Sequence, residues 1–375
     1  MIMELQEYKK ILINTVLQHY PAYLQSKLLK SMTKDDRVIN HKSKIKSGQG
    51  FLLSIDVTGI DGVGNKISHL LEHKEEGLYA KIYKYVEEFE FVKSYRYACI
   101  FEYKEDFDID LISSLDPSHI QLYCHDSDTY DCMWRTGSWI PTVNLESDRV
   151  LFKYSVTLDN RQGDKIKYVV LVVMELDSKR VSVYFDSVAS EYKNPIKDFY
   201  AVMLDTVKRN FEKLIGIKLL TIDFKAIIYY IQYLQNNNVG LSENIKVSAQ
   251  KMKRDGTVSY LEAKKDSSEE PTIPILGELK EWLRERDYLF DANEETRRIR
   301  EELSNFIEEI EQTSDYPKVQ IRFIDKGFHL EMTHAYKNYE YSVFKIDGNL
   351  SDDRELIEYA KVCLDKYYRE LEART

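Results

Sequence analysis

Three strongly apolar segments joined by short polar turns constrain the fold more than any other feature of this sequence. "RVLFKYSVTL" begins at Arg149, "KIKYVVLVVMEL" at Lys165 and "RVSVYFDSVAS" at Arg180; the turns between them are "DNRQGD" and "DSK". A parallel crossover needs a dozen or more residues, so turns this short predict antiparallel neighbours. The segments therefore predict an antiparallel β-meander, and a doubly wound parallel sheet is not expected.

A second meander and several helices complete the predicted fold class. The strands "KVQIRFID", "FHLEMTHAY" and "YEYSVFKID" are followed by a helix that Ser351 caps. The first 32 residues predict two helices broken at Pro21, and "NKISHLLEHKEEG" predicts another. We therefore expect an α+β protein of several units, with antiparallel β-meanders packed against helices and an N-terminal helical segment.

Two further regions give less uniform signals. "LYAKIYKYVEEFEFVKSYRYACIFEY", from Leu78, favours strand, although its first half fits helical and strand periodicity equally. "IKVSAQKMKRDGTVSYLEAK", from Ile245, predicts a hairpin with Asp-Gly at its tip. A linker, "KDSSEEPTIPILG", and a long charged helix near 278–312 follow.

The length and these patterns predict a chain divided into several folding units. The 375 residues exceed the roughly 100–200 residues of one domain. The expected segments are N-terminal helices with a basic connector, a mixed α/β unit, a β-meander with helices and the basic hairpin, and the charged helix with the C-terminal meander and helix. Their boundaries are 1–48, 49–145, 146–270 and 271–375.

Composition narrows the function classes. No apolar run reaches the roughly 18 residues that cross a bilayer, and the N-terminus lacks the pattern of a secretory signal. The four cysteines form no Cys-x-x-Cys pair, which fits a reducing compartment. We therefore expect a cytoplasmic protein without a membrane partner. The formal net charge of −10 argues against a molecule built wholly for duplex binding, although local basic patches can still bind.

The stretch "TGIDGVGNKISHLLEHKEEG", from Thr58, has three interpretations. Gly59 and Gly64 have the spacing of a phosphate loop, but Asn65 is inserted before Lys66 and no hydroxyl residue follows. The second interpretation is a zinc helix. The third, which we favour, is a strand turning into a helix, with glycines that shape the backbone and hold no cofactor.

The zinc interpretation rests on "HLLEH". His69 and His73 are four residues apart, and Glu72 precedes the second histidine, where it would act on metal-bound water. Locally, the motif resembles the inverzincin peptidases. That resemblance implies a further glutamate ligand some seventy residues onward, and Glu146 is the matching candidate.

A magnesium-dependent, nuclease-like site is a separate possibility. "EDFDID" would place Asp106, Asp108 and Asp110 on one face if it were a strand, and such a carboxylate row suits Mg²⁺. Glu262 and Lys264 fit the Glu-x-Lys half of a metal nuclease site. A solvated strand face has the same pattern, so no cofactor is predicted; zinc or magnesium remains the alternative.

The hairpin carries a basic cluster in an otherwise acidic chain. Basic side chains on a hairpin with a flanking tyrosine suit phosphate contact, whereas lysines on an edge strand also prevent sheet-to-sheet aggregation. The predicted nucleic-acid-binding residues are Lys246, Lys251, Lys253, Arg254, Tyr260, Lys264 and Lys265.

These observations favour a non-catalytic binding or assembly protein that contacts nucleic acid or an acidic partner through the hairpin. The frequent Lys, Ile, Tyr and Asn are typical of AT-rich bacterial genomes, and the lack of a metabolic motif favours a phage-defence or mobile-element setting. The alternatives are a metal-dependent hydrolase, of the zinc or nuclease type, and a purely structural subunit. We also expect that the chain binds a protein partner or forms a homo-oligomer.

Overall fold

The computed structural model divides the chain into two compact units. Unit 1 comprises Met1–Ile222 and Ser351–Glu355, and unit 2 comprises Asp223–Leu350 and Leu356–Thr375. The expected segments 1–48 and 49–145 fall in unit 1, whereas the expected segment 146–270 is divided between the units. The residues that the structure describes are 5–34, 37–41, 54–73, 76–123, 139–193, 198–236, 245–254, 257–262, 274–313, 315–347 and 353–374.

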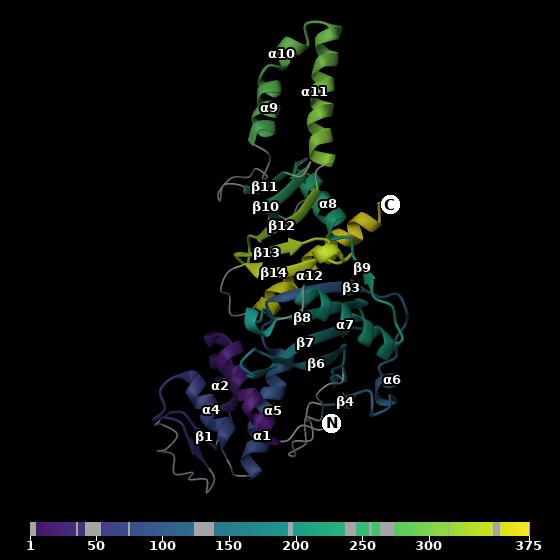
Figure 1. Ribbon diagram of the computed structural model, residues 1–375. Coiled ribbons are helices and arrows are strands. Elements are labelled where there is room, and N and C mark those ends of the chain that lie inside the picture. Colours follow the sequence, from purple (N-terminus) through teal and green to yellow (C-terminus); the bar gives the residue numbers. More distant parts are fainter. Residues whose placement is uncertain are drawn as a thin grey trace. The chain divides into compact units, whose positions relative to one another are not determined.

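Unit 1 contains an antiparallel meander within a mixed sheet, with helices from both ends of its sequence (Figure 1). Its helices are α1 (Leu5–Asn14), the π-helix η1 (Thr15–His19), α2 (Ala22–Met32), α4 (Val63–Glu72), α5 (Glu76–Val92), α6 (Asp110–Ser113), η2 (Ser190–Tyr192) and α7 (Phe199–Ile215). Its strands are β1 (Val38–Ile39), β2 (Ile55–Asp56), β3 (Tyr97–Glu102), β4 (Gln121–Leu122), β5 (Thr142–Leu145), β6 (Arg149–Asp159), β7 (Lys165–Glu175), β8 (Arg180–Phe185) and β9 (Leu220–Thr221).

The predicted meander forms the centre of this sheet. The strand order in unit 1 is β3-β8-β7-β6-β5-β4, in which β6 pairs antiparallel with β7 and β7 with β8. Phe152 of β6 packs edge-on against Phe211 of α7, while α1 contacts β7 on the face that carries Lys167. Helices therefore cover both faces, which explains why nearly every position of β7 is buried.

The segment from Leu78 corrects one prediction. It forms helix α5 through Val92, and strand begins only at Tyr97. Tyr83, Val86 and Phe89 are three apart and buried in a cluster with α1, α2 and α4. Because that face packs on other helices, tertiary contacts select the helical period from a pattern that also fits a strand.

Unit 2 combines a five-stranded antiparallel sheet with helices (Figure 1). Its strands are β10 (Ile245–Arg254), β11 (Thr257–Glu262), β12 (Asp315–Phe323), β13 (Phe328–Thr333) and β14 (Val343–Asp347), in the order β11-β10-β12-β13-β14. Its helices are α8 (Phe224–Asn236), α9 (Pro274–Glu285), α10 (Asp287–Phe290), α11 (Glu294–Thr313), η3 (Tyr336–Asn338) and α12 (Asp353–Glu372, in unit 2 from Leu356).

Helices α8 and α12 pack on one face of this sheet. Phe224 of α8 meets Phe344 with ring centroids 4.8 Å apart, and Tyr359 of α12 packs against Phe323 and Phe328. The residues of β12 and β13 on this face are buried, and those on the opposite face are half-buried and mostly polar. The predicted α+β class, with antiparallel meanders packed against helices, is therefore confirmed. No helix in the described ranges is long and apolar enough to cross a membrane.

Candidate functional site

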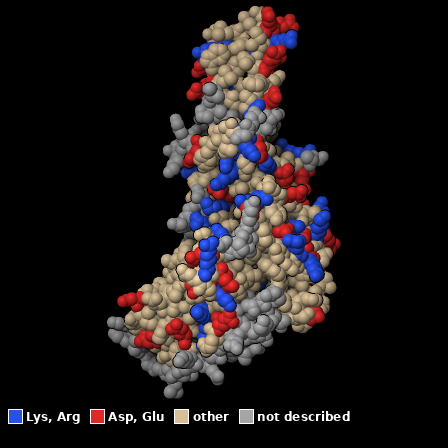
Figure 2. All heavy atoms as spheres, in the orientation of Figure 1, with Lys and Arg blue, Asp and Glu red and all other residues tan. Residues whose placement is uncertain are grey.

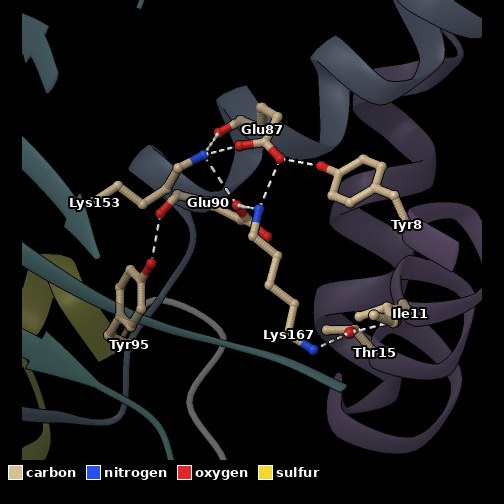
Figure 3. A network of polar contacts seen from close by, with 8 residues as sticks. All are labelled: Tyr8, Ile11, Thr15, Glu87, Glu90, Tyr95, Lys153 and Lys167. Atoms are coloured by element: carbon tan, nitrogen blue, oxygen red, sulfur yellow. Dashed lines mark hydrogen bonds and ion pairs between the residues drawn. The ribbon is translucent and has the colours of Figure 1, made fainter. Parts of the chain in front are cut away.

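Two polar features concentrate charge in this protein, and the first is a buried network in unit 1 (Figure 3). Lys153 of β6 and Lys167 of β7 project from the same sheet face, where Glu87 and Glu90 of α5 meet them. Tyr8 of α1 donates its hydroxyl to Glu87. All five side chains are almost completely buried, so the network lies between sheet and helices and not at the surface.

The network is balanced in charge. Lys167 Nζ lies 2.7 Å from Glu87 Oε1 and 2.6 Å from Glu90 Oε2, and Lys153 Nζ lies 3.0 Å from Glu90 Oε2 and also pairs with Glu87. Burial alone raises the pKa of Glu87, but the two ammonium groups outweigh burial and lower that pKa to about 2. Two basic and two acidic side chains thus lie together away from water, and burial of such groups requires close mutual contact.

The network fixes helices to strands. Thr15 Oγ1 donates to Ile11 O at 2.6 Å and accepts the backbone N–H of Lys167 at 2.8 Å, and the π-helical turn begins at this threonine (Figure 3). Tyr95 Oη donates to Glu90 O at 2.5 Å. These bonds join α1, α5 and β7, so we assign the network a structural role.

The residues of the zinc hypothesis, which all lie in the part of the chain that the structure describes, are not grouped as a metal site. His69 and Glu72 lie on α4, but the helix ends at Glu72 and His73 follows in extended conformation. Glu146 accepts a bond from Arg149 at 2.5 Å, in the turn before β6. Within the described ranges, no three His, Cys, Asp and Glu side chains form a group suited to a metal.

The segment that carries Asp106, Asp108 and Asp110 is not a strand, so the condition for a shared carboxylate face is not met. Residues 105–109 form a loop, and α6 begins at Asp110. Asp106 pairs with Lys179 at 2.7 Å, while Asp108 accepts the backbone N–H of Asp110 at 3.0 Å. Asp108 thus bonds to the backbone next to it, as is usual for aspartates in turns, and Asp106 pairs with a lysine of the β7–β8 turn, so the three residues do not form a carboxylate row on a strand.

The glycine stretch leads from β2 into α4. Gly62 is the N-cap of α4 with a φ of +83°, and Gly64 lies inside the first helical turn. A Cβ on Gly64 would stand 2.8 Å from Leu17 and 3.0 Å from Gln25, so this glycine permits close helix packing. Lys66 donates to Asn40 at 2.9 Å.

The second polar feature is the predicted hairpin, which forms as β10 and β11 and also pairs with β12. Lys251 lies directly opposite Tyr260 on β11 and opposite Lys318 on β12. Lys246 lies opposite Arg322. Residues opposite one another in antiparallel strands share a face, and we name this surface the basic face. It comprises Lys246, Lys251, Lys253, Tyr260, Lys318 and Arg322.

The remaining hairpin residues are distributed differently. Arg254 alternates with Lys253 and therefore points to the opposite face of the sheet. Glu262 lies on the basic face, opposite Ala249. Lys264 and Lys265 lie outside the described residues.

The charge of the basic face is concentrated on β10 and β12. These two strands place five basic residues and one acidic residue, Asp315, on the basic face. Asp315 lies opposite Lys253 and pairs with Lys225 at 2.5 Å. Glu331 of β13 pairs with Lys318 at 2.7 Å. Tyr260 is 60% exposed on the same face. In Figure 2, Lys and Arg atoms gather over β10 and β12, with acidic atoms among them.

Lys318 and Arg322 were not among the nucleic-acid-binding residues predicted from the sequence. They alternate with buried Val319, Ile321 and Phe323, so their position on a solvated strand face was readable from the pattern. Their position beside the hairpin was not, because more than fifty residues separate β11 from β12.

Comparison with known proteins adds no relative. The chain matches no protein-family model, and no curated protein matches it. A function for this fold must therefore be argued from the residues of its own surfaces.

Proposed function

We propose that this chain is a non-catalytic binding protein that contacts nucleic acid through the basic face. The observation that carries the proposal is the direct opposition of cations across β10 and β12: Lys246 faces Arg322, and Lys251 faces Lys318. Like charges directly opposite in a sheet destabilise it. A bound phosphate backbone would remove that repulsion.

The chemistry of the face favours a single strand over a duplex. Strands lie about 4.8 Å apart, so the five strands span roughly 19 Å, which is wider than the major groove of about 12 Å. A single strand can instead lie across the sheet, with phosphates near the cations and a base stacked on Tyr260. The net charge of −10 repels nucleic acid elsewhere, so contacts would be local and salt-sensitive.

Fluorescence anisotropy with labelled single-stranded DNA, single-stranded RNA and duplex DNA tests the proposal. Five phosphate contacts would give a slope of log affinity against log salt of about −3.5, which means roughly 100-fold weaker binding at 200 mM than at 50 mM salt. The variant Lys251→Gln/Lys318→Gln should reduce the slope by about 1.4.

The control variant, Lys326→Gln/Lys366→Gln, removes the same charge from exposed positions of unit 2 away from the basic face. It should leave the slope and the affinity nearly unchanged. Absence of salt-sensitive binding, or equal losses in the two double variants, would refute the proposal.

A further inference from the structure

The helical hairpin of unit 2, α9 to α11, has a small core. Among the hairpin side chains that the structure describes, its hydrophobic cluster buries Leu276, Leu283 and Ile307. Leu279, Phe290, Leu303 and Ile310 are partly buried around them. Three buried side chains among those described are few for a pair of helices.

Large apolar side chains remain in solvent on the same hairpin. Trp282 is 44% exposed, Tyr288 70%, Leu289 49%, Ile299 48% and Phe306 55%. These residues outnumber the buried ones. Single exposed apolar residues are ordinary. Five within one helical hairpin indicate a surface that another molecule covers.

The exposed residues of α11 continue its core stripe. Ile299 and Phe306 are seven residues apart, hence on nearly the same side of the helix. Leu303 and Ile310 form the adjacent row, four residues further on, and pack on the cluster with α9. The apolar stripe of α11 is therefore wider than the part that α9 covers, and its uncovered edge is the row of Ile299 and Phe306.

Acidic residues border this uncovered edge. Glu295, Glu302 and Glu309 repeat every seven residues beside Ile299 and Phe306. Residues 274–313 contain twelve acidic and six basic residues, a net charge of −6 of the chain's −10. All five arginines of the hairpin pair with the hairpin's own acids; they are Arg284, Arg286, Arg297, Arg298 and Arg300. The surplus charge is therefore negative.

We propose that the hairpin is the docking surface for a basic amphipathic helix of a partner protein. Apolar residues of that helix, at intervals of three and four, would cover Ile299 and Phe306, and its flanking Lys and Arg would face Glu295 and Glu309. A second copy of this chain fits less well. Antiparallel pairing of two α11 helices would set Glu302 against its own copy and Glu295 against Glu309, acid against acid.

A synthetic helix of about 18 residues, five turns long, tests the proposal with the full-length protein. Leu would form one face and Lys the flanks, and a scrambled peptide of equal composition would be the control. We expect micromolar binding of the amphipathic peptide by titration calorimetry, and binding at least tenfold weaker to Ile299→Ser/Phe306→Ser. Val362→Ser, an exposed apolar residue of α12 in the same unit, should bind like the parent.

Three results would overturn the inference: no binding of the peptide, equal binding of the scrambled peptide, or equal binding by the Ile299→Ser/Phe306→Ser variant. Light scattering during size exclusion should show a monomer; a dimer abolished by Phe306→Ser would assign the surface to a second copy instead. Nucleic-acid binding should be unchanged in Ile299→Ser/Phe306→Ser, so this test and the test of the basic face fail independently.

Discussion

Lys251 of β10 lies directly opposite Lys318 of β12, on the face of the unit 2 sheet that the helices α8 and α12 do not cover. Glu331 pairs with Lys318 from the next strand, which offsets part of the repulsion. The sheet thus holds two ammonium-bearing residues side by side in a chain of net negative charge. An arrangement that lowers stability is expected to persist where it serves binding.

Lys251→Glu is therefore predicted to raise the stability of the fold and to lower its affinity for nucleic acid. It converts a repulsive cross-strand pair into an attractive one and should raise the free energy of unfolding by about 0.2–1 kcal/mol. Nucleic-acid affinity at low salt should fall at least tenfold. Urea unfolding and anisotropy on the same preparation measure both. Lower stability together with unchanged affinity would contradict the prediction.

Removal of one buried ammonium from unit 1 should be costly. Lys167→Met leaves Glu87 and Glu90 with less compensation, and we expect a loss of about 3–5 kcal/mol in the free energy of unfolding. Lys165, two residues earlier on β7, pairs with Glu7 at 2.8 Å in solvent. Lys165→Met should cost less than about 1 kcal/mol.

A double-mutant cycle tests the network more sharply. Glu90→Gln added to Lys167→Met should recover part of the loss, because a buried charge is removed together with its partner, with a coupling energy of about 1–3 kcal/mol. Additive losses would show that Lys167 acts through packing and not through its charge.

Acid should destabilise unit 1 through Glu87. Its pKa is about 2 in the folded chain against an ordinary 4.5, so its stabilising contribution is complete above pH 4.5 and is lost as pH falls from 4.5 toward 2. Glu87→Gln should be less stable at pH 7 and should lose less stability over that window. Denaturant unfolding at pH 6, 4 and 3 measures the difference, and parallel pH profiles would contradict the assignment.

His334 should make the stability of unit 2 depend on pH in a higher range than Glu87 does. Burial, and then the charge of Lys225, lower its pKa from 6.5 to about 4, while its Nδ1 lies 2.9 Å from Ser342 Oγ. The unfolded chain therefore takes up the proton first, and stability present above pH 6.5 is lost between pH 6.5 and 4. His334→Gln should reduce the fall in melting temperature over that window. The variant should still show part of this fall in melting temperature, because the pKa of His19 in unit 1 is also lowered to about 4.

Gly59, in the loop before α4, and Gly64, in its first turn, should respond differently to substitution by alanine. Gly64→Ala places a methyl group 2.8 Å from Leu17 Cδ2 and 3.0 Å from Gln25 Oε1. Because the Gln25 amide is held by bonds to Val16 O and Tyr20 O, displacing it should cost about 1 kcal/mol. Gly59→Ala meets nothing within 4 Å and should leave the free energy of unfolding within about 0.5 kcal/mol of the parent. Comparable losses at both positions would argue against packing as the reason for Gly64.

Much of the local structure was readable from residue patterns. The paired strands β10 and β11, the two meanders and the helix break at Pro21 form as expected, while the predicted Asp-Gly tip lies outside the described residues. The conformation of Leu78–Val92 was not readable, since its aromatic spacing fits two periods and only burial of Tyr83 and Val86 against other helices selects one. The buried network was missed for the same reason: Glu87 and Glu90 are one helical turn apart only once that segment is a helix.

Residue patterns alone indicated which neighbouring segments pair, because a short polar turn brings adjacent strands side by side in antiparallel orientation. The placement of β12 beside β10, across the insertion of α9 to α11, and of Lys251 opposite Lys318, follows from the folded unit and not from any local pattern. Contacts between distant segments depend on the packing of the whole unit, since their register is set by which faces are buried and not by a turn.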